Sequence, residues 1–489
     1  MAHIEFIDQT LRDGQQSLWG MRMRACQATP ILPNLNATGF DTVDLTGGTF
    51  FVVMLRESGD DPWAALDWLI QGLPDARHRA GMRPVAVGSF GFVPDEMLDL
   101  WVGTLVEHGI DSHWLFDCLY DMPLMKAKAE AIRRVGGEVV PAIMYGLTDL
   151  HTDEFFADRA REMASWEGVE RIYVEDAPGV LTPERAATLL PALQEATPGV
   201  RLELHVHNTT GLAPLVYMEG IRAGIEILHT CSRPMANGPS LPSTEAMVEI
   251  VEEMGHTHDL DKSQLQPVAD HFEREAKRLG WALGVPNEYR TQPYRHQLPG
   301  GMTGTLINQL DEYGMPERFP EVIDEIVRVR EELGQPIMAT PFSQFVGIQA
   351  MLNVVLDERY KVVPEEVLHY ALGHYGPLMR PVEPEIADKI FSQPRVKELE
   401  KWERPQTTVA EFREKFGADL SDEELLLRYL APEEHVDKML ASGPLRTEPP
   451  ASSPDLGDQL MQMIEEAKSR PISHLSLSQP GIRIDLRRD

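Results

Sequence analysis

Short apolar segments alternate with longer amphipathic segments from residue 3 to about residue 235. The apolar segments have the length of β-strands, and they cover residues 4–8, 42–46, 85–89, 114–117, 139–145, 171–176, 202–207 and 226–230. Helical spacing of apolar positions occurs between them, as at residues 62–73, 95–108, 124–135, 152–166 and 183–196. This alternation favours one (β/α)₈ TIM barrel over a doubly wound α/β sheet.

The pattern changes after residue 285. Residues 286–442 carry helical periodicity without strand patterns, which indicates an α-rich domain after a barrel domain at residues 1–285. Residues 443–457 have the Pro, Gly and Ser content of a flexible linker. In residues 458–489 we expect a helix at 458–470 and a β-hairpin made of residues 472–478 and 482–486. Because an isolated hairpin is marginally stable in water, we expect this tail to dock on another chain; a frayed terminus is the alternative.

Charge and cysteine content narrow the classes of function. The chain has 45 Lys and Arg against 77 Asp and Glu, and this net charge of -32 argues against nucleic acid and anionic membranes as partners. Cys26, Cys118 and Cys231 are too scattered for a disulfide framework and indicate a reducing compartment. Since neither a signal-peptide layout nor an apolar run of membrane-spanning length occurs, we expect a cytoplasmic protein.

Polar side chains follow the first predicted strand. Residues 8–17 read Asp-Gln-Thr-Leu-Arg-Asp-Gly-Gln-Gln-Ser, so Arg12, Asp13 and Gln16 come shortly after that strand. In a TIM barrel the carboxyl ends of the strands form the mouth at which catalytic groups gather. Asp117 also ends a predicted strand, and a helix cap is an equally good interpretation of it.

Two histidines end the seventh predicted strand. His205 and His207 are two residues apart, so both side chains point to the same side of the strand. One divalent cation can bind both imidazoles, and Asp13 is the natural third ligand at the same mouth. A pair of structural strand histidines is the alternative, and the position of Asp13 favours the metal site.

The chain resembles the carboxyltransferase region of biotin-dependent 2-oxoacid carboxylases, a family that includes a pyruvate carboxylase subunit, the oxaloacetate decarboxylase α subunit and the transcarboxylase barrel subunit. The motifs that carry the resemblance cover roughly residues 3–400 and lie, in order, at residues 8–17, 46–50, 116–119, 205–207, 296–302, 346–350 and 358–361. The resemblance implies an enzyme whose barrel passes CO₂ between carboxybiotin and an enolisable 2-oxoacid. It implies that Asp13, His205 and His207 bind zinc, manganese, cobalt or iron. Arg12 would stabilise the oxyanion and Gln16 would orient the substrate.

Glu175 is one departure from the family. The family has a carbamylated, metal-binding lysine at this position, and Glu175 keeps the negative charge on a stem that is shorter by roughly three bonds. We therefore expect Glu175 to act as a fourth metal ligand only through a bridging water or an inward shift of its strand, and we count it among the catalytic candidates.

Two further departures concern the substrate. The family binds the substrate carboxylate with an arginine, whereas residues 85–92 contain none, and Arg83 is expected on the opposite or preceding part of the strand. Because valine cannot replace a bidentate arginine, the sequence argues against pyruvate and oxaloacetate as substrates. The family's proton-relaying hydroxyl after the Pro-Gly-Gly turn aligns with Gly304, and the flanking Thr303 is our candidate substitute, with Thr305 beside it.

No Ala-Met-Lys-Met biotin-attachment sequence occurs, so biotin is expected on a separate carrier subunit. The tail at residues 472–488 resembles the assembly segment of separate biotin carrier proteins. The favoured interpretation is a carboxyltransferase subunit that forms a homo-oligomer within a complex with biotin carboxylase and biotin carrier subunits. A metal-dependent lyase or aldolase that does not use biotin and a catalytically silent scaffolding subunit are the alternatives.

Overall fold

Eight parallel strands close into a barrel in the computed structural model, which describes residues 1–88, 91–448, 474–479 and 482–487. The strands pair in chain order, and β1 also pairs with β8. They are β1 Glu5–Asp8, β2 Thr42–Gly47, β3 Arg77–Met82, β4 Ser112–Leu115, β5 Glu138–Met144, β6 Arg171–Asp176, β7 Arg201–Val206 and β8 Ile227–Thr230. The predicted TIM barrel is confirmed.

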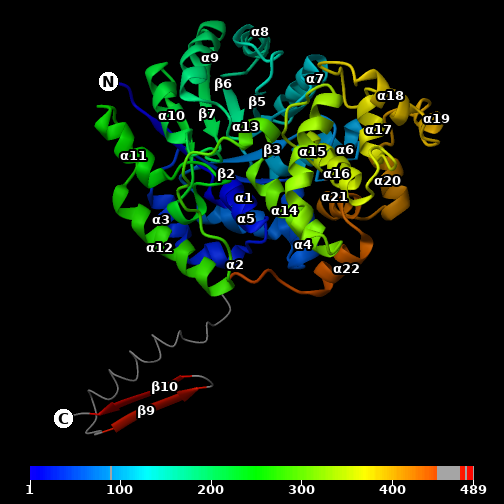
Figure 1. The fold of residues 1–489 in the computed structure, drawn as a ribbon. Coiled ribbons are helices and arrows are strands. Elements are labelled where there is room, and N and C mark those ends of the chain that lie inside the picture. Colours follow the sequence, from blue (N-terminus) through cyan, green and yellow to red (C-terminus); the bar gives the residue numbers. More distant parts are fainter. Residues whose placement is uncertain (89–90, 449–473, 480–481, 488–489) are drawn as a thin grey trace.

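Helices on the outside of the barrel connect the strands and bury their apolar faces against it (Figure 1). Several begin at a capping side chain that accepts a backbone N–H, as Thr152 does from Phe155 and Thr182 from Arg185. The helices of this part are α1 Gln15–Trp19, α2 Ala25–Ala28, α3 Leu32–Ala37, α4 Gly48–Glu57, α5 Pro62–Gly72, α6 Asp95–Glu107, α7 Met122–Arg134, α8 Asp153–Ala164, α9 Pro183–Ala196, α10 Ala213–Arg222, α11 Thr244–Glu253 and α12 Lys262–Leu279.

The third strand differs from its prediction. We expected it at residues 85–89, but β3 is Arg77–Met82, and the next helix, α6, begins at Asp95. Residues 85–89 have the apolar pattern of a strand, whereas β3 itself contains charged and small residues and has no such pattern. Arg79 on β3 is fully buried inside the barrel, where its charge is paired.

Glu203 on β7 is the partner of Arg79. Two guanidinium nitrogens of Arg79 donate to the two carboxylate oxygens of Glu203, with Nη2 to Oε1 at 3.0 Å, and both side chains are fully buried. Glu203 also accepts from His229 Nε2 at 3.0 Å, and Arg171 lies 3.5 Å away. A buried charge is tolerated only with such partners, so β3, β6, β7 and β8 are joined through one carboxylate.

A helical region follows the barrel and packs beside it. Figure 1 shows α15–α22 on one side of the barrel, and the elements in contact include α14 with α1, α21 with α6, and α22 with α4. The prediction of an α-rich part is confirmed, whereas the domain boundary at residue 285 stays a prediction. The helices are α13 Pro293–His296, α14 Gly300–Glu312, α15 Phe319–Glu332, α16 Phe342–Val355, α17 Glu365–Ala371, α18 Pro384–Phe391, α19 Val396–Leu399, α20 Val409–Phe416, α21 Asp422–Leu430 and α22 Glu433–Ala441.

The C-terminal tail contains the expected hairpin. Strands β9 His474–Gln479 and β10 Ile482–Arg487 pair antiparallel as a separate two-stranded sheet. The register pairs Leu475 with Leu486 and Leu477 with Ile484. The predicted helix at 458–470 and most of the predicted linker at 443–457 lie outside the described residues. Among the helices of the described residues, none has both the length and the apolar character needed to span a membrane.

Removing one partner of the buried Arg79–Glu203 pair should destabilise the barrel. We expect Glu203→Leu to lower the free energy of unfolding by about 3–5 kcal/mol, because Arg79 is left with an unpaired buried charge. Arg79→Leu together with Glu203→Leu should recover most of that loss. Urea denaturation of the full chain measures both effects. Glu273→Leu, which removes an exposed partner of Lys277, serves as the control and should cost about 0.5 kcal/mol or less. A Glu203→Leu cost no larger than this control would contradict the argument.

Candidate active site

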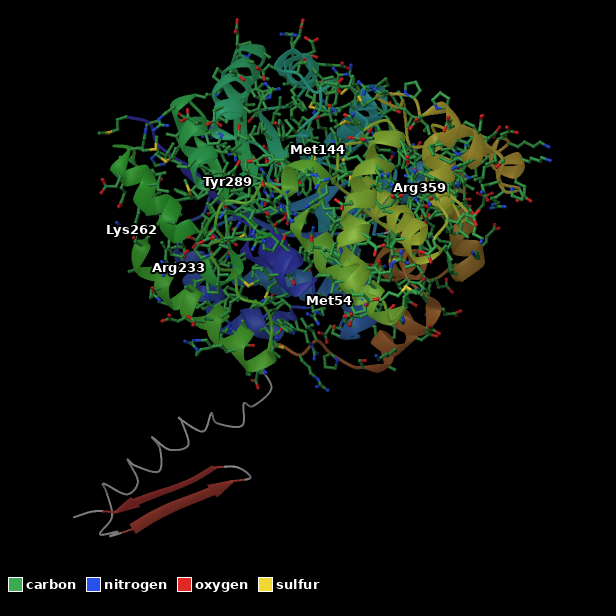
Figure 2. All side chains as sticks on the ribbon, in the orientation of Figure 1. Met54, Met144, Arg233, Lys262, Tyr289 and Arg359 are labelled. Carbon is green, nitrogen blue, oxygen red and sulfur yellow. The ribbon has the colours of Figure 1, made fainter. Side chains whose placement is uncertain are left out.

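A cavity of about 420 Å³ opens at the carboxyl ends of the barrel strands. The charged residues in its wall include Arg12, Asp13, Arg83, Glu175 and His207. Apolar side chains complete the inner wall, namely Met82, Trp114, Phe116 and Met144, the last of which is labelled in Figure 2. A concave site with apolar walls and a few converging polar groups is the form that small-molecule sites take.

The polar motif after β1 bends sharply into this cavity. Residues Thr10–Gly14 form one π-helical turn that places Arg12 and Asp13 at the mouth. Asp8 supports the turn, since its carboxylate accepts from the Thr10 hydroxyl at 2.6 Å and from the Thr10 N–H at 3.1 Å. Gly14 lies so close to Met235 that a Cβ at residue 14 would come within 2.9 Å of the Met235 side chain. A larger residue would therefore push the motif out of place.

Asp13, His205 and His207 come together as the sequence predicts. Each offers a ligand atom, and these atoms lie within 4.8 Å of one another. Asp13 Oδ2 lies 3.7 Å from His205 Nε2 and 3.6 Å from His207 Nε2, and all three residues are buried. Two imidazoles and one carboxylate around a common point suit zinc, manganese, cobalt or iron. This donor set fits the divalent metal that the sequence implies.

The outer nitrogen of each histidine has a partner that leaves Nε2 directed at the common point. His207 Nδ1 donates to the carbonyl oxygen of Pro239 at 2.6 Å. His205 Nδ1 lies 2.6 Å from the hydroxyl of Tyr173. Such contacts orient the imidazole rings of metal sites and select the tautomer that can bind metal.

The electrostatics of the group depend on the Asp13 carboxylate. Burial favours its neutral form, but His207 and Arg12 outweigh burial and hold the pKa of Asp13 well below its ordinary value. Burial also favours the neutral form of His207, but the Asp13 carboxylate outweighs burial and raises the pKa of His207 to about 9. His207 therefore carries an extra proton at neutral pH in the metal-free protein, and this proton must leave when a metal binds to the imidazole.

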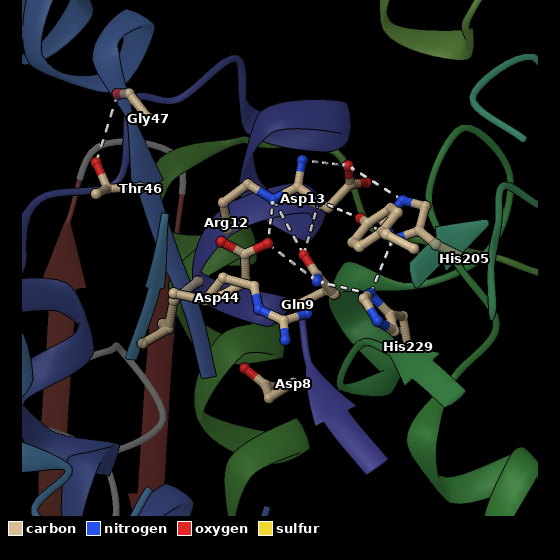
Figure 3. A network of polar contacts seen from close by, with 12 residues as sticks. Asp8, Gln9, Arg12, Asp13, Asp44, Thr46, Gly47, His205 and His229 are labelled. Carbon is tan, nitrogen blue, oxygen red and sulfur yellow. Dashed lines mark hydrogen bonds and ion pairs between the residues drawn. The ribbon is translucent and has the colours of Figure 1, made fainter. Parts of the chain in front are cut away.

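Arg12 is held rigidly at the edge of this group (Figure 3). Its Nε and Nη2 donate to Gln9 Oε1 at 3.0 and 2.8 Å, and its Nη1 lies 3.0 Å from Asp13 Oδ2. The guanidinium also lies over the ring of Trp114, 5.1 Å from its centroid. A cation fixed in this way can stabilise an oxyanion without reorganising during a reaction.

Glu175 lies in the cavity wall at the end of β6, where it pairs in register with His205. Burial raises the pKa of Glu175 to about 7, and among the described residues no group hydrogen-bonds its Oε2. Its carboxylate is not among the ligand atoms that lie within 4.8 Å of one another in the Asp13 group. Its role as a fourth metal ligand therefore stays a prediction.

The remaining predicted residues lie in different surroundings. Gln16 lines the cavity at its exposed rim. Thr303 lies on α14, but the described lining of the cavity includes Gly301 and Met302 and not Thr303. A threonine that the sequence analysis missed, Thr340, does line the cavity, and its hydroxyl accepts from Gln344 Nε2 at 3.1 Å. Asp117 does not cap a helix: its carboxylate accepts the N–H groups of Leu119 and Asp121 in the turn before α7, and Asp121 is the N-cap of that helix.

Arg83 corrects a second prediction. Because β3 ends at Met82, Arg83 lies at the barrel mouth in the cavity wall and not on the preceding or opposite part of a strand. It is 8% exposed, and burial lowers the pKa of its guanidinium to about 10, so it stays charged at neutral pH. The helical region braces the loop that follows it, since Arg404 Nη2 donates to the carbonyl oxygens of Pro84 and Val93.

Comparison with known proteins agrees with this architecture. The Conserved carboxylase domain family matches residues 294–446, and the HMGL-like family matches residues 121–271. The chain is similar to the carboxyl transferase domain of Rhizobium etli pyruvate carboxylase, whose structure with pyruvate and biocytin superposes with a TM-score of 0.80 at 24% identity over 90% of this chain and 77% of that one. At this identity the likeness shows the fold.

Relatives with higher identity extend over most of the chain. The 2-oxoglutarate carboxylase large subunit of Hydrogenobacter thermophilus is 30% identical over 90% of this chain and 69% of its own length. A pyruvate carboxylase subunit of Methanocaldococcus jannaschii is 32% identical over 463 residues, which are 93% of this chain and 80% of that protein. The chain therefore belongs to the carboxyltransferase-subunit family of the biotin-dependent carboxylases.

Proposed function

We propose that this chain transfers a carboxyl group from carboxybiotin, carried on a partner subunit, to an enolisable 2-oxoacid. The observation that carries the proposal is that Arg12 and Arg83 share one cavity wall with Asp13 and His207. The buried His205 lies beside Asp13 and His207, outside the described lining of the cavity. A metal at Asp13, His205 and His207 would polarise the acceptor's carbonyl group. Arg12 is placed to stabilise the oxyanion of the enolate, and Arg83 to bind the acceptor's carboxylate.

The position of Arg83 at the barrel mouth changes which acceptors the cavity favours. The sequence argued against pyruvate because residues 85–92, the expected strand end, contain no arginine, and Arg83 now stands at the actual strand end. We therefore propose a 2-oxoacid acceptor and include pyruvate in the class. The relatives are named for pyruvate and for 2-oxoglutarate, which both carry the carboxylate that Arg83 would bind.

The reaction needs a group that carries a proton from the acceptor to biotin. The reaction breaks the N–C bond of carboxybiotin and forms a C–C bond at the acceptor, so the proton lost from the acceptor's carbon must reach the ureido nitrogen. A hydroxyl can accept one proton and donate another. We propose Thr340 for this step in place of Thr303, because Thr340 lines the cavity and Thr303 is absent from the described lining.

The partners follow from the absence of a biotin-attachment sequence in the chain. We propose that biotin carboxylase and biotin carrier subunits complete the enzyme and that the chain forms a homo-oligomer within it. The β9–β10 hairpin supports a docking role, since two strands alone are marginally stable and the register brings apolar residues opposite one another. We also propose the division into a barrel domain, an α-rich domain, a linker and a docking segment.

Purification from the native host tests the function. We expect the chain to co-purify with a biotinylated protein and with a divalent metal, and we expect Asp13→Asn to lose the metal. Deletion of residues 458–489 should weaken the association with the biotinylated chain and leave the metal in place. Avidin blotting and elemental analysis of the same samples measure both. Metal without a biotinylated partner would favour the lyase, and a biotinylated partner without metal would favour a scaffolding subunit.

Substitution of Arg83 tests the acceptor. Arg83→Leu removes the hydrogen bonds to a carboxylate, which are worth about 1.5–3 kcal/mol, so kcat/KM for the acceptor should fall roughly 10- to 150-fold. Carboxylation assays of the assembled enzyme with pyruvate and with 2-oxoglutarate measure the effect. Arg233→Leu is the matched control, because Arg233 is exposed outside the described lining of the cavity (Figure 2). Equal losses in the two variants would count against the assignment.

A pair of threonine variants tests the proton transfer. We expect Thr340→Val to lower kcat by about 10²-fold or more, the typical contribution of a proton-transferring group, and to change KM little. Thr303→Val should retain wild-type kcat. The same assay measures both variants at saturating acceptor. The reverse result would restore the assignment of Thr303 made from the sequence.

A further inference from the structure

Tyr173 on β6 lies between the predicted metal ligands and Arg12. Its hydroxyl oxygen is 2.6 Å from His205 Nδ1, and Arg12 Nη2 donates to the same oxygen at 3.3 Å. The side chain is fully buried in the barrel. One phenol oxygen therefore contacts both a candidate metal ligand and the cation proposed to stabilise the enolate.

The tyrosine ring is fixed by its neighbours. It stacks on Trp114 with the centroids 5.0 Å apart and the planes at 11°, and it lies at 88° to the ring of His229 with the centroids 4.6 Å apart. Trp114 occupies its place because β3 carries a glycine beside it: a Cβ at Gly81 would come within 2.5 Å of the Trp114 ring. The position of the hydroxyl is therefore set by packing, independently of its hydrogen bonds.

The tautomer of His205 depends on this hydroxyl. For Nε2 to bind a metal, Nδ1 must carry the proton and donate it to an acceptor. His229 Nδ1 lies 3.2 Å from His205 Nδ1, but the lone pair of His229 Nδ1 already accepts from Gln9 Nε2 at 2.9 Å. The His229 proton is on Nε2, which donates to Glu203. When Nε2 binds a metal, Tyr173 is therefore the group left to accept the Nδ1 proton of His205.

We propose that Tyr173 is a positioning residue that holds His205 in its metal-binding tautomer and ties it to Arg12. The inference rests on the metal site of the proposed function and adds a residue to it. His207 receives the equivalent support from the backbone carbonyl of Pro239, which no substitution of the side chain removes. Tyr173 is therefore the support that mutation can test.

Metal titration of Tyr173→Phe tests the proposal. This variant keeps the ring against Trp114 and removes the oxygen alone. We expect the Kd for Co²⁺, titrated into the metal-free full chain, to rise about 10- to 100-fold, the usual effect of losing a partner of a ligating histidine. The visible absorption of bound Co²⁺ should also change, because the orientation of one imidazole is no longer fixed.

Tyr217→Phe is the matched control. Tyr217 is equally buried, and its hydroxyl donates to the carbonyl of His229 at 2.7 Å and accepts from the N–H of Val206 at 3.2 Å. Removing it costs hydrogen bonds in the same barrel without touching an imidazole of the proposed site. We expect Tyr217→Phe to lower the melting temperature of the metal-free protein and to keep the wild-type Kd for Co²⁺.

The Co²⁺ titrations distinguish a failure of the proposed metal site from a failure of the positioning role of Tyr173. If the wild-type chain binds no Co²⁺, the proposed metal site is wrong. If the wild type binds and Tyr173→Phe binds equally well, or if both tyrosine variants lose affinity alike, the positioning role is wrong. Should Tyr173→Phe not fold, 3-fluorotyrosine at residue 173 weakens the oxygen as an acceptor while keeping the ring, and an unchanged Kd for Co²⁺ would equally overturn the role.

Discussion

The interaction on which the rest of the structure depends is the burial of the Glu203 carboxylate inside the barrel. An isolated carboxylate is too costly to bury, so its partners from three other strands must all be in place. One of them, His229, is thereby oriented with Nε2 toward Glu203 and Nδ1 toward Gln9. Gln9 in turn accepts from Arg12 through its side-chain oxygen (Figure 3). The position of the candidate catalytic arginine is therefore linked, through two neutral side chains, to a charge below the active site.

The same interaction explains where sequence reasoning succeeded and failed on the fold. Most strands and helices could be predicted because their apolar positions follow the period of the element that buries them. The third strand could not be predicted, because an arginine such as Arg79 is ordinarily exposed. Its partner Glu203 lies more than a hundred residues later in the chain, so the sequence does not indicate that Arg79 is buried. Misplacing β3 by several residues also misplaced Arg83, and with it the argument about the acceptor. The unrecognised burial of Arg79 against Glu203 thus contributed to both errors.

The site could be predicted in the parts that are local in sequence. Asp13 comes in the turn after a strand and His205 and His207 share one face of a strand, so spacing alone brings them to the barrel mouth. Thr340 could not be found in this way, since it comes from the helical region and reaches the cavity only in the folded chain. Tyr173 was missed for another reason: a tyrosine in a buried strand is ordinarily core, and only its neighbours reveal a polar role.

The metal side and the acceptor side proposed for the cavity are formed by different parts of the chain. The predicted metal ligands and their supports all come from the barrel and the segments that follow its strands, whereas the acceptor side depends on the helical region as well. Arg404 holds both ends of the loop after β3 through the carbonyls of Pro84 and Val93, and Thr340 enters the cavity from the same region. Changes in the helical region would therefore alter the proposed acceptor side of the cavity while the predicted metal ligands stay in register. This division gives a physical reason for relatives with one fold to be named for different 2-oxoacids.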